Sequence, residues 1–400
     1  MDKQYIFTMI TFLSSFPIVY YYMLMFGGGF QYFFNYRKSA IGFKARHRFF
    51  IAIPAHNEQE VISKSLEALL RLEYPKDLFD VFVVADYCSD QTAHLARAKG
   101  VTTIERNEGS RGNKSKALSY LFDRFLNDSY DAVVIFDADT IAHKEFLSRM
   151  NDQLCTGSNV IQGSRKVYNY MSSGFAALAE ASILINNLFE NAGRNAFGLS
   201  AKLNGDSVCI RRSIIKQFGF GDGLAEDQYI RHVLIRNGYK VEFEPLAIGW
   251  GQAPVSWKSA KEQRNRWFRG NLDCDREHFS KNIISLLKSP SLTKIDTLIE
   301  MILPKYTSYA FFIGFLTIFT SFLVYGIQVL EAHLFLALVM LFALTAAFPI
   351  FCLYFSKAPL RVYKSLFLGP FYILWRFDVL FRLLILGHKV KWIRTQRESV

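Results

Sequence analysis

The stretch AVVIFDAD, residues 132–139, joins a short run of β-branched and aromatic residues to two carboxylates. An apolar run of this length is typical of a strand buried on both faces of a parallel sheet. Asp137 and Asp139 then follow the carboxyl end of the strand, where α/β sheets bind ligands. Two acids one residue apart can share a divalent cation, Mg²⁺ or Mn²⁺, that holds the phosphates of a nucleotide. Solvated or capping acids are the alternative.

Similar patterns on both sides of this stretch predict an α/β domain. Two further apolar runs, residues 49–53 and 80–84, are also typical of buried strands. Helical spacing of apolar residues fills the gaps between the strands, at residues 60–71, 91–99 and 116–125. Alternating strands and helices predict a parallel sheet with crossover helices, in one domain over residues 49–281.

A third acid, Asp86, follows the strand at 80–84 and is expected at the same edge of the sheet. Ser89 and Asp90 come next, and capping of the following helix is the simpler role for these two. The segment GNKSK, residues 112–116, forms a flexible basic loop before a helix. Lys114 in that loop is a candidate contact for a diphosphate, although a solvated lysine pair fits equally well.

Two acids farther along, Glu226 and Asp227, directly precede an amphipathic helical pattern. One role for either residue is purely structural: an acid in the first turn of a helix, stabilised by the helix dipole. The same position would keep a carboxylate ionised and ready to accept a proton from a sugar hydroxyl. These acids are therefore candidates for a general base.

The segment QRNRW, residues 263–267, is compatible with a helix in which Gln263, Arg266 and Trp267 share one face. Arginine pairs well with phosphate, and tryptophan offers a flat apolar platform to a sugar ring. A helix on the membrane surface, with Arg and Trp among the lipid headgroups, is the alternative.

Three long runs without a charged residue predict membrane-spanning helices, at residues 5–34, 306–330 and 334–355. Each exceeds the roughly 20 residues that cross a hydrocarbon core as a helix. Lysines and arginines follow the first run and the third, and such residues stay on the cytoplasmic side. We therefore expect a multi-pass protein of the plasma (inner) membrane whose α/β domain faces the cytoplasm.

The rest of the chain is divided around these runs. Residues 1–48 are expected to be an anchor with a basic linker, and residues 282–305 an interfacial amphipathic region. Residues 306–356 form a predicted transmembrane hairpin, and residues 357–400 an interfacial helix with a basic tail. Because charged residues interrupt the apolar stretch 366–386, it is expected to lie on the membrane rather than cross it.

The amino-acid composition excludes some classes of protein and favours others. Hydrophobic residues make up 51% of the 400, which excludes a disordered chain. The 47 Lys and Arg against 35 Asp and Glu favour an anionic membrane face or an anionic substrate such as a nucleotide, and nothing supports a nucleic-acid partner. Five single cysteines suggest neither a zinc site nor a disulfide framework and are expected to be reduced and mostly buried.

Taken in order, five motifs resemble the inverting glycosyltransferases of family 2: PAHNE (54–58), DYCSD (86–90), DAD (137–139), ED (226–227) and QRNRW (263–267). The resemblance covers residues 49–272 and is closest to the membrane-embedded branch that includes hyaluronan, chitin and cellulose synthases. It implies a GT-A nucleotide-sugar-binding domain with transmembrane helices at both ends. The implied activity is transfer of a hexose from a nucleoside diphosphate donor to a polysaccharide or oligosaccharide acceptor, with inversion.

The resemblance also implies roles for individual residues on the donor side. Asp86 would contact the region of the nucleotide base, Asp137 the nucleotide and Asp139 the divalent metal. Gln263 and Arg266 would hold the diphosphate leaving group.

On the acceptor side, Asp227 would be the catalytic base and Trp267 would border the acceptor sugar. An alternative acceptor is a lipid or a lipid-linked sugar, modified in a single step. A transporter is a rival class, but it would need ionisable residues inside its spans, and the three runs have none. A nucleotide-binding regulator without catalysis is another rival.

Overall fold

A mixed sheet forms the core of the chain, which is seen here as a computed structural model. The structure describes residues 3–34, 42–109, 113–221, 223, 225–254, 257–326 and 332–375. Within these residues the strand order is β3-β2-β1-β4-β7-β6-β8-β5. The strands are β1 (Phe49–Ala55), β2 (Phe79–Asp86), β3 (Thr102–Arg106), β4 (Ala132–Ile135), β5 (Ile141–Ala142), β6 (Val160–Val167), β7 (Val208–Arg211) and β8 (Val241–Gly251).

The predicted parallel arrangement is correct for β1 to β4 and for the pair of β6 and β8, and it is wrong for β7 and β5, which run antiparallel to their neighbours. β3, β2, β1 and β4 run parallel, as the strand and helix repeats predict. β7 runs antiparallel to both of its neighbours, β4 and β6. The reason is the long connection over residues 168–207, which leaves β6 and enters β7 at the same edge of the sheet.

Both faces of the sheet are buried, as the continuous apolar runs predict. Phe49, Ile51 and Ile53 of β1 belong to one hydrophobic core, while Phe50 and Ala52 belong to the other. The helices of this domain are α2 (Ile62–Leu70), η1 (Lys76–Leu78), α3 (Thr92–Ala98), α4 (Lys114–Phe125), α5 (Phe146–Cys155), α6 (Gly174–Ile185), η2 (Asn186–Gly193), α7 (Arg194–Ala196), α8 (Arg212–Phe218) and α9 (Glu226–Arg236).

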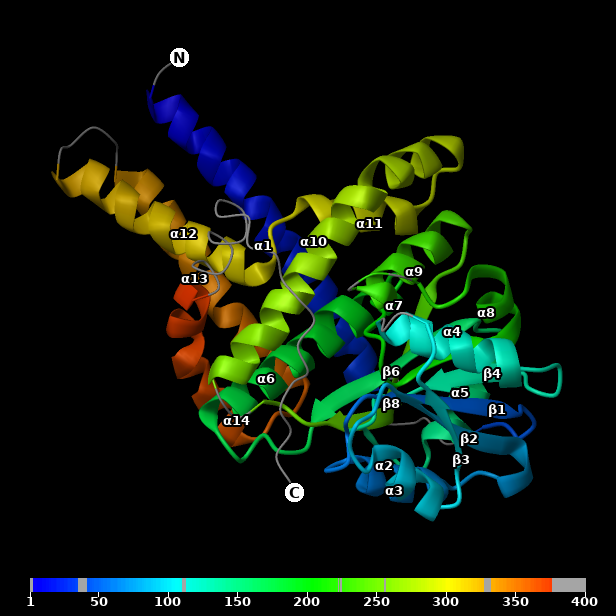
Figure 1. Cartoon of the computed structure of the whole chain (residues 1–400). Helices are drawn as coiled ribbons and strands as arrows, with labels where there is room; N and C mark the ends of the chain where they lie inside the picture. Colours follow the sequence, from blue (N-terminus) through cyan, green and yellow to red (C-terminus); the bar gives the residue numbers. More distant parts are fainter. Residues whose placement is uncertain are drawn as a thin grey trace.

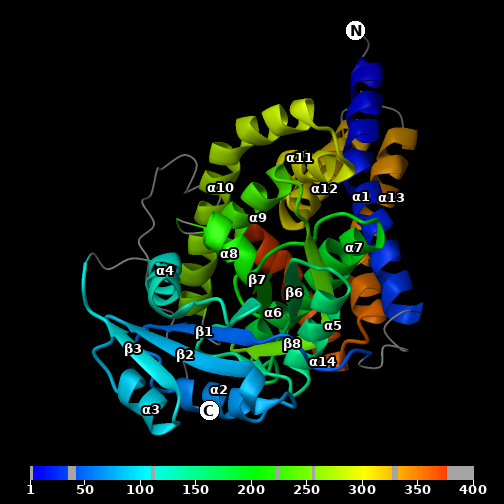
Figure 2. The same cartoon turned by 90° about the vertical axis from the view of Figure 1, so that its right-hand side faces the viewer.

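Within the described residues, three helices are long and apolar enough to cross a membrane: α1 over Lys3–Tyr32, α12 with η3 over Tyr306–Gly326, and α13 over Ala332–Phe355. They coincide with the three predicted spans. Figure 1 and Figure 2 show them gathered on one side of the molecule, away from β1, β2 and β3. Bulky apolar side chains such as Phe12, Ile318 and Met340 are exposed on them, as expected of surfaces that face lipid.

The remaining elements connect the domain to these helices. They are α1 (Lys3–Phe34), α10 (Trp257–Lys288), α11 (Leu292–Ile302), α12 (Tyr306–Ser321), η3 (Phe322–Gly326), α13 (Ala332–Phe355), α14 (Leu360–Ser365) and η4 (Leu366–Leu368). α10 continues through residue 281, the expected end of the α/β domain. The linker residues 35–41 and part of the predicted interfacial stretch, residues 376–386, lie outside the described residues. All five cysteines are free, and Cys209, Cys274 and Cys352 are buried.

Glycines allow α1 to pack directly against the backbone of η2. A Cβ placed on Gly193 would lie 2.2 Å from the Leu24 carbonyl oxygen, and one on Gly28 would lie 2.2 Å from the Leu188 carbonyl oxygen. Neither backbone atom can move aside as a flexible side chain could. The α1 helix is therefore joined to the domain by a close backbone contact.

We expect Gly193→Ala to destabilise the protein, because the added methyl group would push α1 away from η2. Overpacking of this kind costs about 1–3 kcal/mol, seen as a lower melting temperature in detergent. Gly42→Ala is the matched control, since a Cβ there meets no atom within 4 Å. Equal melting temperatures for the two variants would contradict the close contact.

Candidate active site

A large cavity of about 1770 Å³ lies at the carboxyl ends of the parallel strands. It is the edge at which open α/β sheets bind their ligands. The nine residues singled out in the sequence all line this cavity: Asp86, Lys114, Asp137, Asp139, Glu226, Asp227, Gln263, Arg266 and Trp267. They come from segments up to 181 positions apart in the chain, and their individual roles stay predictions.

Asp86, the last residue of β2, is fixed by its neighbours. Its Oδ1 accepts a hydrogen bond from Arg106 Nε at the end of β3, at 2.5 Å, and both side chains are almost fully buried. His56 Nδ1 lies 2.6 Å from the Asp86 carbonyl oxygen. Tyr87 then turns the chain with a φ of 50°, and its hydroxyl donates to the Gly109 carbonyl. These contacts hold Asp86 rigidly in the cavity wall.

The two acids after β4 have different partners. Asp137 accepts a hydrogen bond from the Lys114 ammonium, and its own amide donates to Asp206 Oδ1 at 3.0 Å. Asp139 is buried, and its Oδ2 accepts from the Gln252 amide, just after β8, at 3.0 Å. The backbone amides of the loops therefore fix the position of both acids.

The lysine pair of the basic loop divides between two environments. Asn113 caps α4 by accepting from the Lys116 amide, and the Lys116 side chain is exposed. Lys114 turns into the cavity and donates to the Gly205 carbonyl at 2.7 Å. Burial opposes the charge of Lys114, but Asp137 and other nearby carboxylates raise its pKa. Lys114 is thus a positive group within the site rather than a solvated one.

Ser89 and Asp90 were expected to cap the following helix, but the N-cap position of α3 is Gln91. Asp90 precedes it, and the Asp90 Oδ1 accepts from the Thr92 amide at 3.0 Å. Ser89 instead contacts Asn57, whose Oδ1 accepts from the Ser89 amide at 2.7 Å. Both residues thus order the loops beside Asp86.

Arg165 of β6 is a functional candidate that the sequence reasoning missed. Its Nε lies 3.1 Å from Asp206 Oδ2. Burial opposes its charge, but Asp206, Asp137 and Asp139 raise the pKa of Arg165, and Asp227 adds to this effect. The residue is therefore a cation among the carboxylates of the site. A single arginine in an otherwise ordinary strand has no local signal that could have identified it.

Asp206, like Arg165, is brought into the site by the fold. It is fully buried, and burial together with Asp137 raises its pKa to about 6. Its Oδ1 also accepts from the Thr140 hydroxyl at 3.0 Å. Asn204 and Gly205, which precede Asp206 in the chain, line the same cavity.

Glu226 and Asp227 form the first turn of α9, as expected. Burial and the neighbouring Asp227 raise the pKa of Glu226 to about 7. Burial also raises the pKa of Asp227, although its Oδ1 accepts from the Gln228 amide at 2.8 Å. The helix dipole was expected to keep these carboxylates ionised, but in the structure burial raises the pKa of both. A raised pKa brings a carboxylate closer to the range that suits a general base.

The QRNRW segment lies on α10, on the other side of the cavity from β4. Gln263, Arg266 and Trp267 line the cavity, and Trp267 keeps 43% of its surface exposed. Their shared face follows from helical spacing, as the sequence predicts.

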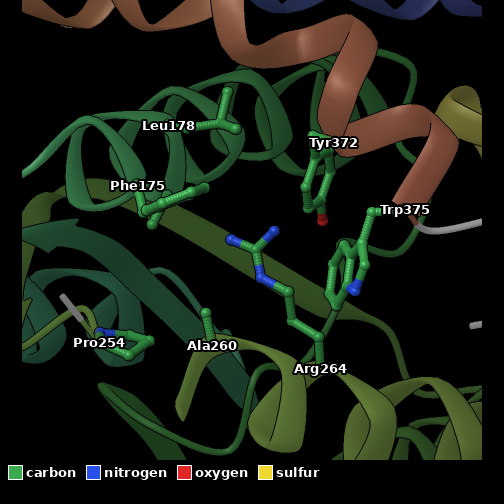
Figure 3. A pocket seen from close by; sticks show the side chains of 8 residues that line it. Phe175, Leu178, Pro254, Ala260, Arg264, Tyr372 and Trp375 are labelled. Atoms are coloured by element: carbon green, nitrogen blue, oxygen red, sulfur yellow. The ribbon is translucent and has the colours of Figure 1, made fainter. Parts of the chain in front are cut away.

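Arg264, between these residues, belongs to a separate contact. Its guanidinium carbon lies 4.5 Å from the centre of the Tyr372 ring, a cation–π distance. Figure 3 shows the guanidinium between Phe175 and Leu178 on one side and Tyr372 and Trp375 on the other. The contact ties α10 to the helical segment that follows η4.

A divalent cation fits the donor set of this site only with help from a substrate. Asp137 and Asp139 offer hard carboxylate oxygens, the ligands that Mg²⁺ and Mn²⁺ accept. Among the described residues, no group of three or more His, Cys, Asp or Glu side chains is arranged to hold a metal ion. Mg²⁺ is commonly bound by one or two carboxylates plus substrate phosphates, and this donor set agrees with that arrangement.

Comparison with known proteins gives one family match. A family model described as "Glycosyltransferase like family 2" matches residues 47–270. The probable glycosyltransferase YdaM of Bacillus subtilis is 31% identical over 270 residues, which cover 63% of this chain and 62% of that protein. The poly-β-1,6-N-acetyl-D-glucosamine synthase of Staphylococcus aureus is 26% identical over 228 residues, covering 54% of this chain and 53% of that protein. The chain thus matches little more than half the length of these relatives.

A solved structure supports the fold. A mannosyltransferase from Pyrobaculum calidifontis, solved with GDP-mannose and Mn²⁺, superposes with a TM-score of 0.55 at 15% identity. The superposition covers 91% of this chain and 99% of that one. The likeness therefore includes helices outside the sheet domain.

Proposed function

The chain belongs to the glycosyltransferase-like family 2, and from this premise we propose that it transfers a hexose from a nucleoside diphosphate donor, with inversion, to a glycan acceptor. One observation carries the proposal: the acids after β2 and β4, the acids of α9 and the QRNRW face of α10 border one cavity. Residues proposed to bind the donor, to act as base and to contact the leaving group can therefore all reach one bound substrate complex.

In this proposal the donor lies along the strand ends. Asp86 contacts the base region, and Asp137 with Lys114 contacts the ribose and diphosphate. Asp139 would hold a divalent cation, which would neutralise charge on the departing diphosphate. A solved mannosyltransferase of similar fold contains Mn²⁺ and GDP-mannose, which supports a metal and a nucleotide sugar here as well.

Asp227 is the proposed general base. Its carboxylate takes the proton of an acceptor hydroxyl, and the oxygen attacks the anomeric carbon as the bond to the diphosphate breaks. Gln263 and Arg266 stabilise the charge that develops on the leaving diphosphate. Attack from the side opposite the leaving group inverts the anomeric centre. Glu226 lies beside Asp227 and would tune its protonation.

The acceptor is proposed to stack on Trp267, whose exposed indole suits the apolar face of a sugar ring. The staphylococcal relative makes a polymer of N-acetylglucosamine, which supports a glycan acceptor. We also propose that α1, α12 and α13 anchor the chain in the plasma (inner) membrane with the active site on the cytoplasmic side. Lys357, Arg361 and Lys364 directly after α13 support this orientation.

A donor screen tests the proposal. Full-length protein in detergent is incubated with UDP-, GDP- and CDP-linked sugars, and release of nucleoside diphosphate is measured. We expect one class of donor to respond, loss of release in EDTA, and recovery with added Mg²⁺ or Mn²⁺. No release from any donor would overturn the proposed activity, and release unaffected by EDTA would overturn the metal.

A further inference from the structure

The helix that carries the proposed base packs against the helix that carries the leaving-group contacts through polar side chains. Asp227 lies in the first turn of α9 and Arg266 lies on α10, and Figure 2 shows the two helices side by side. Gln228, His232 and Asn282 are buried where the helices meet. Buried polar groups are stable only when they are hydrogen-bonded, so the partners of these side chains define how the helices fit together.

Asp275 of α10 is at the centre of this contact. Its Oδ1 accepts from the Gln228 side-chain amide at 3.2 Å and lies 3.3 Å from His232 Nε2. Asp275 and Gln228 also line the cavity, and the Asp275 side chain keeps 18% of its surface exposed. One carboxylate oxygen at the border of the proposed active site therefore holds two successive turns of α9.

The ring of His232 is held in the tautomer that this contact needs. The Asn282 side-chain nitrogen lies 3.0 Å from His232 Nδ1, and an amide nitrogen can only donate. The Asn282 oxygen accepts from Arg236 Nη1 at 3.1 Å, which fixes the orientation of the amide. The ring proton is therefore on Nε2, where it donates to Asp275. Burial lowers the pKa of His232, which keeps the ring neutral at neutral pH.

A second buried imidazole supports the first. His278 of α10 stacks on His232 with 5.2 Å between the ring centres, and its Nδ1 accepts from Arg236 Nη1 at 2.7 Å. Burial and the neighbouring His232 lower the pKa of His278 to about 4. The two helices are thus joined by uncharged rings, and their hydrogen bonds are satisfied in one register of α9 against α10.

The contact reaches the proposed base through one residue. The side chain of Gln228 is bound to Asp275, and its backbone amide donates to Asp227 Oδ1 at 2.8 Å. On α10, Arg266 precedes Asp275 by roughly 13.5 Å along the axis, at about 1.5 Å per residue. Asp275 therefore links the position of the base to the helix that carries the leaving-group contacts.

The proposed transfer depends on this distance. The attacking oxygen must approach the anomeric carbon from the side opposite the diphosphate, so the base and the leaving-group contacts must keep a fixed separation. A misplacement of about 1 Å can cost on the order of 10²-fold in rate. Apolar side chains would allow the helices to slide slightly, whereas a fully satisfied buried polar network specifies one arrangement.

We propose that Asp275 is a positioning residue for sugar transfer, which fixes the proposed base relative to the leaving-group contacts of α10. It acts through its hydrogen bonds to Gln228 and His232 and takes no proton from the acceptor. The inference rests on the proposed function and adds to it a residue that lies outside the five motifs of the sequence.

The test compares two substitutions of Asp275 in full-length protein in detergent. Asp275→Ala removes the accepting oxygen, and we expect kcat for release of nucleoside diphosphate from the responding donor to fall about 10- to 100-fold. KM for the donor should change little, because the proposed donor contacts after β2 and β4 are untouched. Asp275→Asn keeps an oxygen that can accept both hydrogen bonds and should restore most of the rate.

Gln228→Ala tests the same contact from α9, and it serves also if Asp275→Ala does not fold. It should lower kcat to a similar degree, and the double variant should be no slower than the slower single variant, because both changes break one contact. Titration with the product nucleoside diphosphate counts the molecules that bind it, so kcat is expressed per folded molecule. A loss caused by unfolding alone would leave that kcat unchanged.

Asp273→Ala is the matched control, two residues away on the same helix. Asp273 is exposed, pairs with Arg269 at 2.8 Å and does not line the cavity. We expect its kcat and its KM for the donor to match those of the wild type.

The outcomes separate positioning from other roles. A wild-type kcat per folded molecule in Asp275→Ala and Gln228→Ala would overturn the inference and leave the proposed function standing. A rate for Asp275→Asn as low as that for Asp275→Ala would also overturn it, since the charge and not the hydrogen bonds would then matter. An equal loss in Asp273→Ala would overturn it as well. Absence of release by the wild type from every donor would instead count against the proposed function.

Discussion

Asp227→Asn is expected to lower the rate of sugar transfer by roughly 10²- to 10⁴-fold, the usual contribution of a general base. The amide keeps the size of the side chain and can still accept from the Gln228 amide, but it cannot take the acceptor proton. The measurement is kcat at saturating donor and acceptor, with the melting temperature followed in parallel. Unchanged melting with a reduced kcat is the predicted pair of results.

Two further measurements make this prediction specific. Burial raises the pKa of Asp227, so the wild-type rate should fall as the pH drops through that pKa, where the base becomes protonated. The residual rate of Asp227→Asn should lack this acidic limb. Asp123→Asn, an exposed carboxylate on α4, is the control and should behave like the wild type. A wild-type rate for Asp227→Asn would remove this residue from the mechanism.

Arg266→Ala should reduce kcat by roughly 10²- to 10³-fold, the effect of losing one preorganised group that stabilises developing charge. The arginine is expected to pair with the leaving diphosphate, so its removal acts on bond breaking more than on donor binding. Arg266→Lys keeps the charge and loses the planar fork, and we expect partial recovery. The measurement is single-turnover transfer with enzyme in excess over donor.

A neighbouring arginine provides the matched control. Arg269 lies three residues along α10 and pairs with Asp273 at 2.8 Å on a partly exposed face, and it does not line the cavity. Arg269→Ala should therefore transfer sugar at close to the wild-type rate. Similar losses in both alanine variants would point to a damaged helix and not to a lost contact with the diphosphate.

The local patterns of the chain were enough to identify the domain and its family. The strands near residues 49, 80 and 132 are buried on both faces, so their apolar runs are continuous and easy to recognise. The acids that follow two of them must meet at one edge, because parallel strands end on the same side. The uncharged runs form long helices, in which the backbone satisfies its own hydrogen bonds without water.

The reversal of β7 and the presence of Arg165 in the site could not be predicted in this way. The direction of β7 depends on where a connection of some forty residues returns, which no short pattern specifies. Arg165 becomes a central cation only because β6 lies beside β8 and across from Asp206. Gly28 and Gly193 lie 165 positions apart, so their joint role in the contact between α1 and η2 is visible only in the folded chain.

Residue types and their spacing along the chain thus determined the chemical groups available to this protein: acids at strand ends, a basic loop, a helix face with Gln, Arg and Trp, and three apolar helices. Folding alone decided which of these groups share a cavity and in which direction burial moves their pKa values. The physical reason is that short-range patterns report on hydrogen bonding and burial within one element. Charge coupling and cavity shape, by contrast, depend on distances between elements that only packing determines.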